Sequence, residues 1–200
     1  MITILDAGIS NIGSLQNMLK KIGEKVIVTR DIEVLSKAER LILPGVGAFD
    51  AGIQRLHDAG VIDTLNDLAY RRAIPILGIC LGMHLMCRSS EEGTLKGLGF
   101  FDADVKKINT GNTLKVPHMG WNNTHPCNDH PLMHSDDKMR FYYVHSFHPH
   151  CDHQGDRIAT ARYGQDLTVG LAKDNLMAVQ FHPEKSHRFG MRLLSNFAKI

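Results

Sequence analysis

The stretch from Pro75 to Gly82 (PILGICLG) constrains the fold of this chain more than any other. Its first five residues, 75–79, are apolar, which indicates a strand buried on both faces. A helical pattern follows directly, and a glycine stands two residues before and two residues after Cys80. A buried strand that turns sharply into a helix is typical of a parallel sheet covered by helices. The sequence therefore predicts an α/β fold.

The rest of the chain extends this pattern and then departs from it. In the first half, apolar runs predict strands at 2–6, 25–29, 40–43 and 75–79, and helical patterns cover 10–22 (with Ser10 as N-cap), 49–58 and 61–71. In the second half, short strands joined by turns are predicted at 105–108, 114–117, 140–145, 158–163, 167–172 and 176–181, and a last helix covers about 187–198. We expect a mainly parallel central sheet flanked by helices, with extra antiparallel strands in the second half.

Length and charge narrow the possible functions. The 200 residues suit one domain, so 1–200 is predicted to be a single unit. A net charge of +2 without a basic stripe argues against nucleic acid as a partner. The first residues lack the features of a signal peptide, and the most apolar stretch, Ala73–Met86, is too short to span a bilayer. A cytoplasmic location without membrane contact is expected.

Four cysteines occur without a CxxC pair, which argues against a disulfide framework. Cys80 differs from the others because it stands at the predicted junction of strand and helix. The flanking glycines permit the sharp turn of a nucleophile elbow, which projects the central side chain from the carboxyl end of the sheet. The start of the helix would favour a thiolate there. The alternative is an ordinary buried cysteine that acts as a small hydrophobic residue.

A thiolate nucleophile needs a base and a group that orients the base. His182 closes a predicted apolar strand in the segment AVQFHPEKS, and Glu184 follows two residues later. In extended backbone, residues i and i+2 project to the same side, so the Glu184 carboxylate can reach the imidazole. The pattern predicts a pair in which Glu184 fixes the tautomer of His182.

The loop PGVG at 44–47 follows another predicted strand. Its glycines let backbone N–H groups turn toward a developing oxyanion, although an ordinary glycine-rich turn has the same pattern. The chain contains neither GxGxxG nor GxxxxGK[ST], which argues against a nucleotide-binding loop.

Together, PGVG, GICLGM, VPHMGWN, YYVHSF and VQFHPEKS span nearly the whole chain and resemble class I (triad) glutamine amidotransferases. PHMGWN with VHSF and HPEKS resembles, more narrowly, the glutaminase subunits of imidazole glycerol phosphate synthase in histidine biosynthesis. The resemblance implies that Cys80 attacks the glutamine carboxamide, His182 shuttles protons and Glu184 orients His182. It also implies an oxyanion hole from the N–H of Leu81 and one N–H of the loop Gly45, Val46 and Gly47, with Val46 contributing after a peptide flip.

The same resemblance implies a heterodimer without a cofactor, in which ammonia passes to a (β/α)8-barrel cyclase partner. The glutamine amino group is assigned to Glu92, and the glutamine carboxylate to the backbone of His145, Ser146 and Phe147. The partner interface and tunnel mouth are assigned to Asn11, Trp121, Tyr142 and Lys185.

His84 departs from the pattern because the family usually has Gln there, among the substrate contacts. An imidazole replaces a carboxamide poorly, since the neutral ring has one donor and one acceptor. The sequence predicts a changed affinity for glutamine, or a pH dependence centred near the ordinary pKa of about 6.5. The histidine-rich stretch 145–153 is not predicted to bind metal, because its spacing fits no closed zinc pattern.

Three other functions stay open. A paralogue could supply ammonia to another acceptor, such as a sugar of surface polysaccharides. A stand-alone cysteine hydrolase could use the same elbow, but it has no reason to carry Trp121 and Lys185 together. A silent regulatory subunit commonly loses a member of the triad, and this chain has all three.

Overall fold

The computed structural model describes residues 1–8, 12–111, 113–134 and 139–200. Its centre is a nine-stranded sheet in the order β2-β1-β3-β4-β12-β11-β10-β7-β8. The parallel part consists of β1 (Ile2–Leu5), β2 (Val26–Thr29), β3 (Leu41–Gly45), β4 (Ile76–Cys80) and β12 (Leu176–Val179). The antiparallel part consists of β7 (His118–Pro126), β8 (Met139–His145), β10 (Arg157–Tyr163) and β11 (Gln165–Lys173). The central parallel strands are buried along their length because helices cover both faces.

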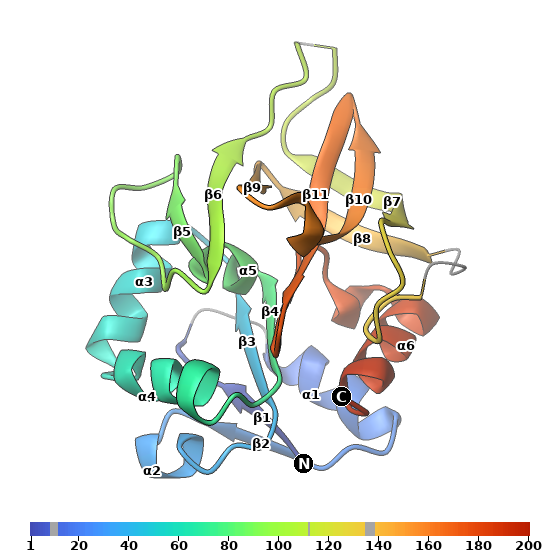
Figure 1. Ribbon diagram of the computed structural model, residues 1–200. Coiled ribbons are helices and arrows are strands. Elements are labelled where there is room, and N and C mark those ends of the chain that lie inside the picture. Colours follow the sequence, from blue (N-terminus) through green and yellow to red (C-terminus); the bar gives the residue numbers. More distant parts are fainter. Residues whose placement is uncertain (9–11, 112, 135–138) are drawn as a thin grey trace.

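Helices lie on the two sides of the parallel strands (Figure 1). On one side are α1 (Ile12–Lys21) and α6 (His187–Phe197), which pack Leu15, Leu19 and Leu193 into a core with β1 and β4. The other side carries α2 (Ile32–Leu35), α3 (Phe49–Asp58), α4 (Ile62–Asn66), the π-helical turn η1 (Asp67–Arg71) and α5 (Leu81–Leu85). Each helix therefore buries one apolar stripe against the sheet.

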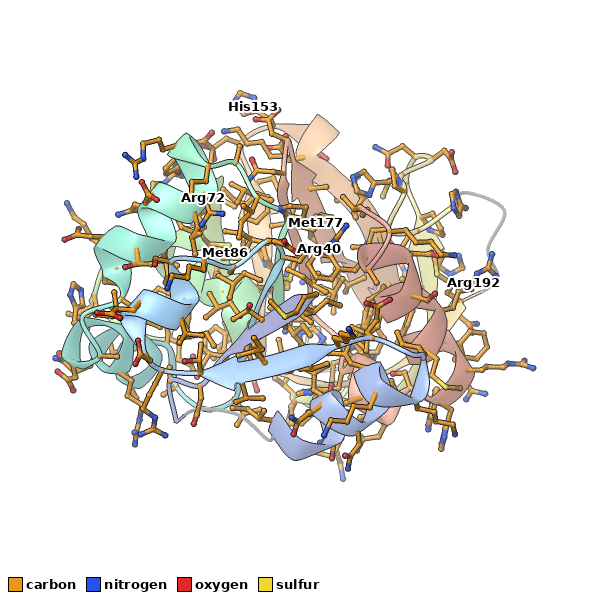
Figure 2. All side chains as sticks on the ribbon, turned by 90° about the horizontal axis from the view of Figure 1, so that it is seen from below. Arg40, Arg72, Met86, His153, Met177 and Arg192 are labelled. Carbon is orange, nitrogen blue, oxygen red and sulfur yellow. The ribbon has the colours of Figure 1, made fainter. Side chains whose placement is uncertain are left out.

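A second, three-stranded sheet lies beside α5 and has the order β5-β6-β9 (Figure 1). It contains β5 (Cys87–Ser90), β6 (Phe101–Lys107) and β9 (Phe147–Cys151). The described ranges also contain two short 3₁₀ turns, η2 (Gln154–Asp156) and η3 (Pro183–Lys185). In the view from below, Met86 and Met177 lie inside the molecule, whereas Arg192 and His153 lie at its rim (Figure 2).

Most of the predicted elements are confirmed, including the helix at 49–58 and the antiparallel strands of the second half. The strand predicted at 114–117 is wrong, because β7 begins only at His118. Pro117 has no N–H to donate to a ladder, and Leu114 is exposed. The single helix predicted at 61–71 changes its winding at Asp67, where η1 begins. Ser10, the predicted N-cap, lies outside the described residues.

No helix in the described ranges has both the length and the apolar character that crossing a bilayer requires.

Candidate active site

Three neighbouring strands deliver the predicted catalytic groups to one edge of the sheet. β3 and β4 are parallel, and their register pairs Gly45 with Cys80, the last residue of each strand. β4 also runs parallel to β12, with Ile79 opposite Val179, so His182 emerges just beyond the end of the adjacent strand. The Val46–Gly47 loop, the thiol and the imidazole thus meet at the carboxyl ends of parallel strands, where open α/β sheets bind ligands.

The backbone of Cys80 is held in an unusual conformation, with φ 53° and ψ −109°. Left-handed φ is uncommon for a residue with a side chain and marks a turn that its surroundings enforce. Gly82 makes this turn possible, since a Cβ at that position would stand 1.8 Å from the carbonyl oxygen of Leu43. A Cβ at Gly78 would stand 2.6 Å from the sulfur of Met86. The structure therefore has the predicted elbow, although α5 is only five residues long.

His182 and Glu184 form the pair that their spacing predicts. Nδ1 of His182 donates a hydrogen bond to Oε1 of Glu184 at 2.8 Å, with both side chains nearly enclosed. Nε2 of His182 is buried and makes no regular hydrogen bond within the described structure. Burial lowers the pKa of His182, but the interactions with Cys80 and Glu184 outweigh it and raise the pKa to about 9. The ring is therefore suited to carry a proton beside Cys80.

A cavity of about 310 Å³ opens over Cys80. Its lining includes ten of the twelve residues that the sequence assigns to catalysis or substrate: Val46, Gly47, Cys80, Leu81, His84, Glu92, His145, Ser146, Phe147 and His182. Gly45 is not among them, so its role as a substrate contact stays a prediction. It is buried at the end of β3, where a Cβ would stand 3.0 Å from that of Leu81. Glu184 also lies outside the lining, because it contacts the far side of His182.

His84 lies in the cavity wall but is already engaged within the protein. Its Nε2 donates to Oε1 of Gln180 at 2.7 Å, and the amide nitrogen of Gln180 makes a long hydrogen bond of 4.0 Å to the sulfur of Cys80. Burial lowers the pKa of His84 to about 4, and the bond to Gln180 opposes this shift. A ring with this pKa is neutral at pH 6.5, which argues against the pH dependence that the sequence predicts there.

Gln180 is a site residue that the motif analysis missed. It is fully buried and directly follows β12, two residues before His182, a spacing that puts both side chains on the same side where the backbone is extended. The alternation of AVQFH contains this signal, but a polar residue inside an apolar strand can equally be a structural group.

A chain of hydrogen bonds sets the orientation of His145. Nδ1 of His145 donates to the carbonyl oxygen of Phe147 at 2.8 Å, so its Nε2 accepts from Nδ1 of His118, also at 2.8 Å. Asn122 in turn donates to Nε2 of His118 at 3.1 Å. These roles assign neutral tautomers to both rings. Burial lowers the pKa of His118 to about 4 and also holds the pKa of His145 well below its ordinary value, in agreement with this assignment.

The predicted interface residues form a partly exposed group on β7, β8 and η3. Trp121 is 38% exposed and packs edge-on against Tyr142, and Lys185 lies over the Tyr142 ring. The backbone of Tyr142 is joined to the neighbouring turn: its carbonyl accepts from the N–H of His182, and its N–H donates to the hydroxyl of Ser186, each at 3.0 Å. Asn11 lies outside the described residues.

Known proteins match this chain over its whole length. Residues 3–200 match the family model described as glutamine amidotransferase class-I. Two curated relatives bear the name imidazole glycerol phosphate synthase subunit HisH 2. The one from Methanococcus maripaludis is 49% identical over 100% of this chain and 99% of its own. The one from Pseudomonas aeruginosa is 43% identical over 100% of both chains.

Solved structures confirm the predicted fold class. PurLQS from Thermotoga maritima superposes with a TM-score of 0.71 at 17% identity, over 99% of this chain and 97% of the other. The glutaminase domain of Trypanosoma brucei CTPS with bound acivicin superposes with a TM-score of 0.67 at 15% identity, over 99% and 93%. At such low identities the similarity concerns the fold alone.

Proposed function

This chain belongs to the class-I glutamine amidotransferase family, and from that premise we propose that it is the glutaminase subunit of imidazole glycerol phosphate synthase. It hydrolyses L-glutamine to glutamate and ammonia for histidine biosynthesis. The observation that carries the proposal is the meeting of Cys80, His182 and the Val46–Gly47 loop at one cavity, with Glu184 behind the imidazole. Relatives named as this subunit match the full chain.

The geometry supports a thioester mechanism. The Cys80 thiolate attacks the carboxamide carbon, and the negative charge that develops on oxygen is received by the N–H of Leu81 and an N–H of the Val46–Gly47 loop. The protonated His182 gives its proton to the leaving nitrogen, so ammonia departs and a glutamyl thioester remains. His182 then removes a proton from water, which attacks the thioester, and glutamate leaves as Cys80 returns to the thiolate. Glu184 keeps the ring oriented throughout.

The substrate amino group is assigned to Glu92, and its carboxylate to the backbone at 145–147. Ammonia passes to a (β/α)8-barrel cyclase partner in a heterodimer, which contacts Trp121, Tyr142, Lys185 and Asn11. Trp121 is partly exposed in this chain, and a partner that covered it would bury its ring. Aromatic residues buried in this way dominate the cores of protein interfaces, which supports the assignment. The cytoplasm remains the predicted compartment.

A second candidate function has a specific observation in its favour. The relatives from Methanococcus maripaludis and Pseudomonas aeruginosa both carry the number 2 in their names. A number of this kind distinguishes one subunit of this name from another. The paralogue that supplies a sugar of surface polysaccharides is therefore retained as the alternative.

One experiment separates these functions. Glutamate release from glutamine is measured for the chain alone, with a barrel cyclase and its acceptor ligand, and with a sugar amidotransferase partner. Strong stimulation by the cyclase and conversion of its ligand support the first function, and stimulation by the sugar enzyme alone supports the paralogue. Equal activity in all three would indicate a stand-alone hydrolase. No hydrolysis with either partner would indicate a silent subunit.

A further inference from the structure

The cavity residue Glu92 is tied to a helix that follows the oxyanion loop. Its Oε2 accepts a hydrogen bond at 3.0 Å from the N–H of Phe49, the first residue of α3. This N–H has no partner within the helix, so the carboxylate satisfies it. Oε1 of Glu92 makes no hydrogen bond to any residue in the described part of the chain, and it is the atom left to receive a ligand.

A second carboxylate joins the same two segments, but this one belongs to the helix and accepts from the loop. Asp50, the next residue of α3, accepts hydrogen bonds from the N–H of Thr94 at 3.0 and 2.9 Å and from the N–H of Leu95 at 3.0 Å. The hydroxyl of Thr94 adds a bond at 3.2 Å. These backbone bonds, those of Thr94 first, lower the pKa of Asp50, so the group is ionised at neutral pH. The loop bonds to the helix through Glu92, and the helix bonds to the loop through Asp50.

The residue between these attachment points has no room for a side chain. A Cβ on Gly93 would stand 2.0 Å from Oδ1 of Asp50 and 2.5 Å from its Cγ. A methyl group here would displace the carboxylate, which four hydrogen bonds hold. The loop therefore holds Asp50 in two ways: Gly93 packs directly against the carboxylate, and Thr94 and Leu95 donate hydrogen bonds to it.

We propose that Asp50 is a positioning residue of the glutaminase site. It holds the segment 92–95 against α3, so that Oε1 of Glu92 stays in the cavity, where it receives the substrate ammonium. The inference rests on the proposed function, since it takes glutamine as the ligand and Glu92 as its ammonium partner. Because α3 follows the Val46–Gly47 loop within two residues, the same contact fixes the amino-group site relative to the oxyanion loop.

Asp50→Ala and Gly93→Ala test the proposal in the complex with the cyclase partner. Both variants should raise the KM for glutamine about tenfold to a hundredfold, because a small misplacement of a binding group is costly, while kcat changes little. Inactivation by acivicin, an amino-acid electrophile, should slow by a similar factor. Inactivation by iodoacetamide, a neutral carboxamide without an α-ammonium group, should proceed at the wild-type rate. On a Glu92→Gln background, Asp50→Ala should add almost nothing.

Asp63→Ala is the matched control, because Asp63 is also an acidic residue in the first turn of a helix, but it is exposed on α4. It should leave both inactivation rates unchanged. An unchanged KM in Asp50→Ala, or equal losses with acivicin and iodoacetamide, would overturn the positioning role. The inactivation rates can be measured without turnover. If the proposed function fails, the wild type releases no ammonia, and this result is distinct from a failure of the positioning role.

Discussion

His84 and Gln180 are joined by a buried hydrogen bond of 2.7 Å, and this bond decides which end of the Gln180 amide faces Cys80. Because Nε2 of His84 donates, the amide oxygen turns toward the ring and the amide nitrogen toward the sulfur of Cys80. The residue at which the sequence departs from its family pattern thus supports a polar contact beside the sulfur of Cys80.

The first prediction concerns this pair. His84→Gln keeps a donor for Gln180, so KM and kcat for glutamine should stay within about threefold of wild type. His84→Leu removes the donor and frees the amide to rotate, and kcat should fall about tenfold. Because the pKa of His84 is about 4, its ring should not titrate between pH 6 and 8. The KM of the wild type should therefore show no step in this range that is missing in His84→Gln. Steady-state kinetics across this range would reveal such a step, and its presence would contradict the buried neutral ring.

The second prediction concerns the nucleophile. Cys80→Ala should lower glutaminase activity about a thousandfold or more, while circular dichroism and partner binding stay unchanged. Cys87→Ala and Cys151→Ala are the controls. Burial raises the pKa of the Cys87 thiol, and it raises that of Cys151 to about 11, so neither is a ready thiolate. Substantial glutamate release by purified Cys80→Ala would remove Cys80 from the mechanism.

The third prediction concerns the oxyanion loop. Val46→Pro deletes one backbone N–H, and losing such a donor should lower kcat about a hundredfold to a thousandfold. Val46→Ala keeps the N–H and should retain most activity, since the Val46 side chain is 47% exposed. Wild-type activity should also be low without the partner and rise strongly with it, if the donor is misdirected in the free subunit. Equal kcat values for the two Val46 variants would exclude this N–H.

The fourth prediction concerns stability as a function of pH. Burial lowers the pKa of His84 and His118 to about 4 and that of His148 to about 3, and His145 is also lowered. Between pH 6.5 and 5 the unfolded chain binds more protons, so the free energy of unfolding should fall as the pH falls. Each of these histidines contributes up to about 1.4 kcal/mol per pH unit in this window.

His182 acts in the opposite direction at higher pH. Its pKa is raised to about 9, so its contribution is complete below 6.5 and is lost as the pH rises through 9. Urea unfolding at pH 5, 6.5 and 9 should therefore show the highest stability at the middle value. His148→Gln should reduce the loss of stability between pH 6.5 and 5. His153→Gln changes an exposed position and should leave that loss as it is in the wild type. A stability that rises from pH 6.5 to 5 would contradict the assignment.

The fifth prediction concerns the partner surface. Trp121→Ala should weaken binding of the cyclase about thirtyfold, a typical loss for an aromatic residue at an interface centre. Val34→Ala removes a comparably exposed apolar side chain on α2 and should leave the affinity unchanged. Isothermal titration calorimetry measures both. Identical affinities for the two variants would place the docking surface elsewhere.

The sequence predicted the parallel half of the fold well because apolar runs such as 75–79 have one clear interpretation. It missed β7, where Gly120 and two asparagines interrupt the alternation, and β9, which contains Pro149. Pro149 is tolerated because β9 is an edge strand of the small sheet. Cys80, His182 and Glu184 were predicted from local spacing. The contacts of Gln180 and Asp50 join segments distant in sequence, and local patterns carry no information about such pairs.

β8 ends the large sheet, and an exposed edge strand invites pairing with a foreign strand. Here the middle of that edge is closed, because the N–H and carbonyl of Tyr142 are already bonded to Ser186 and His182. A protein that approaches this face therefore cannot extend the sheet through Tyr142 and must recognise side chains instead. The turn that contains His182 thus also protects the sheet against edge-to-edge aggregation.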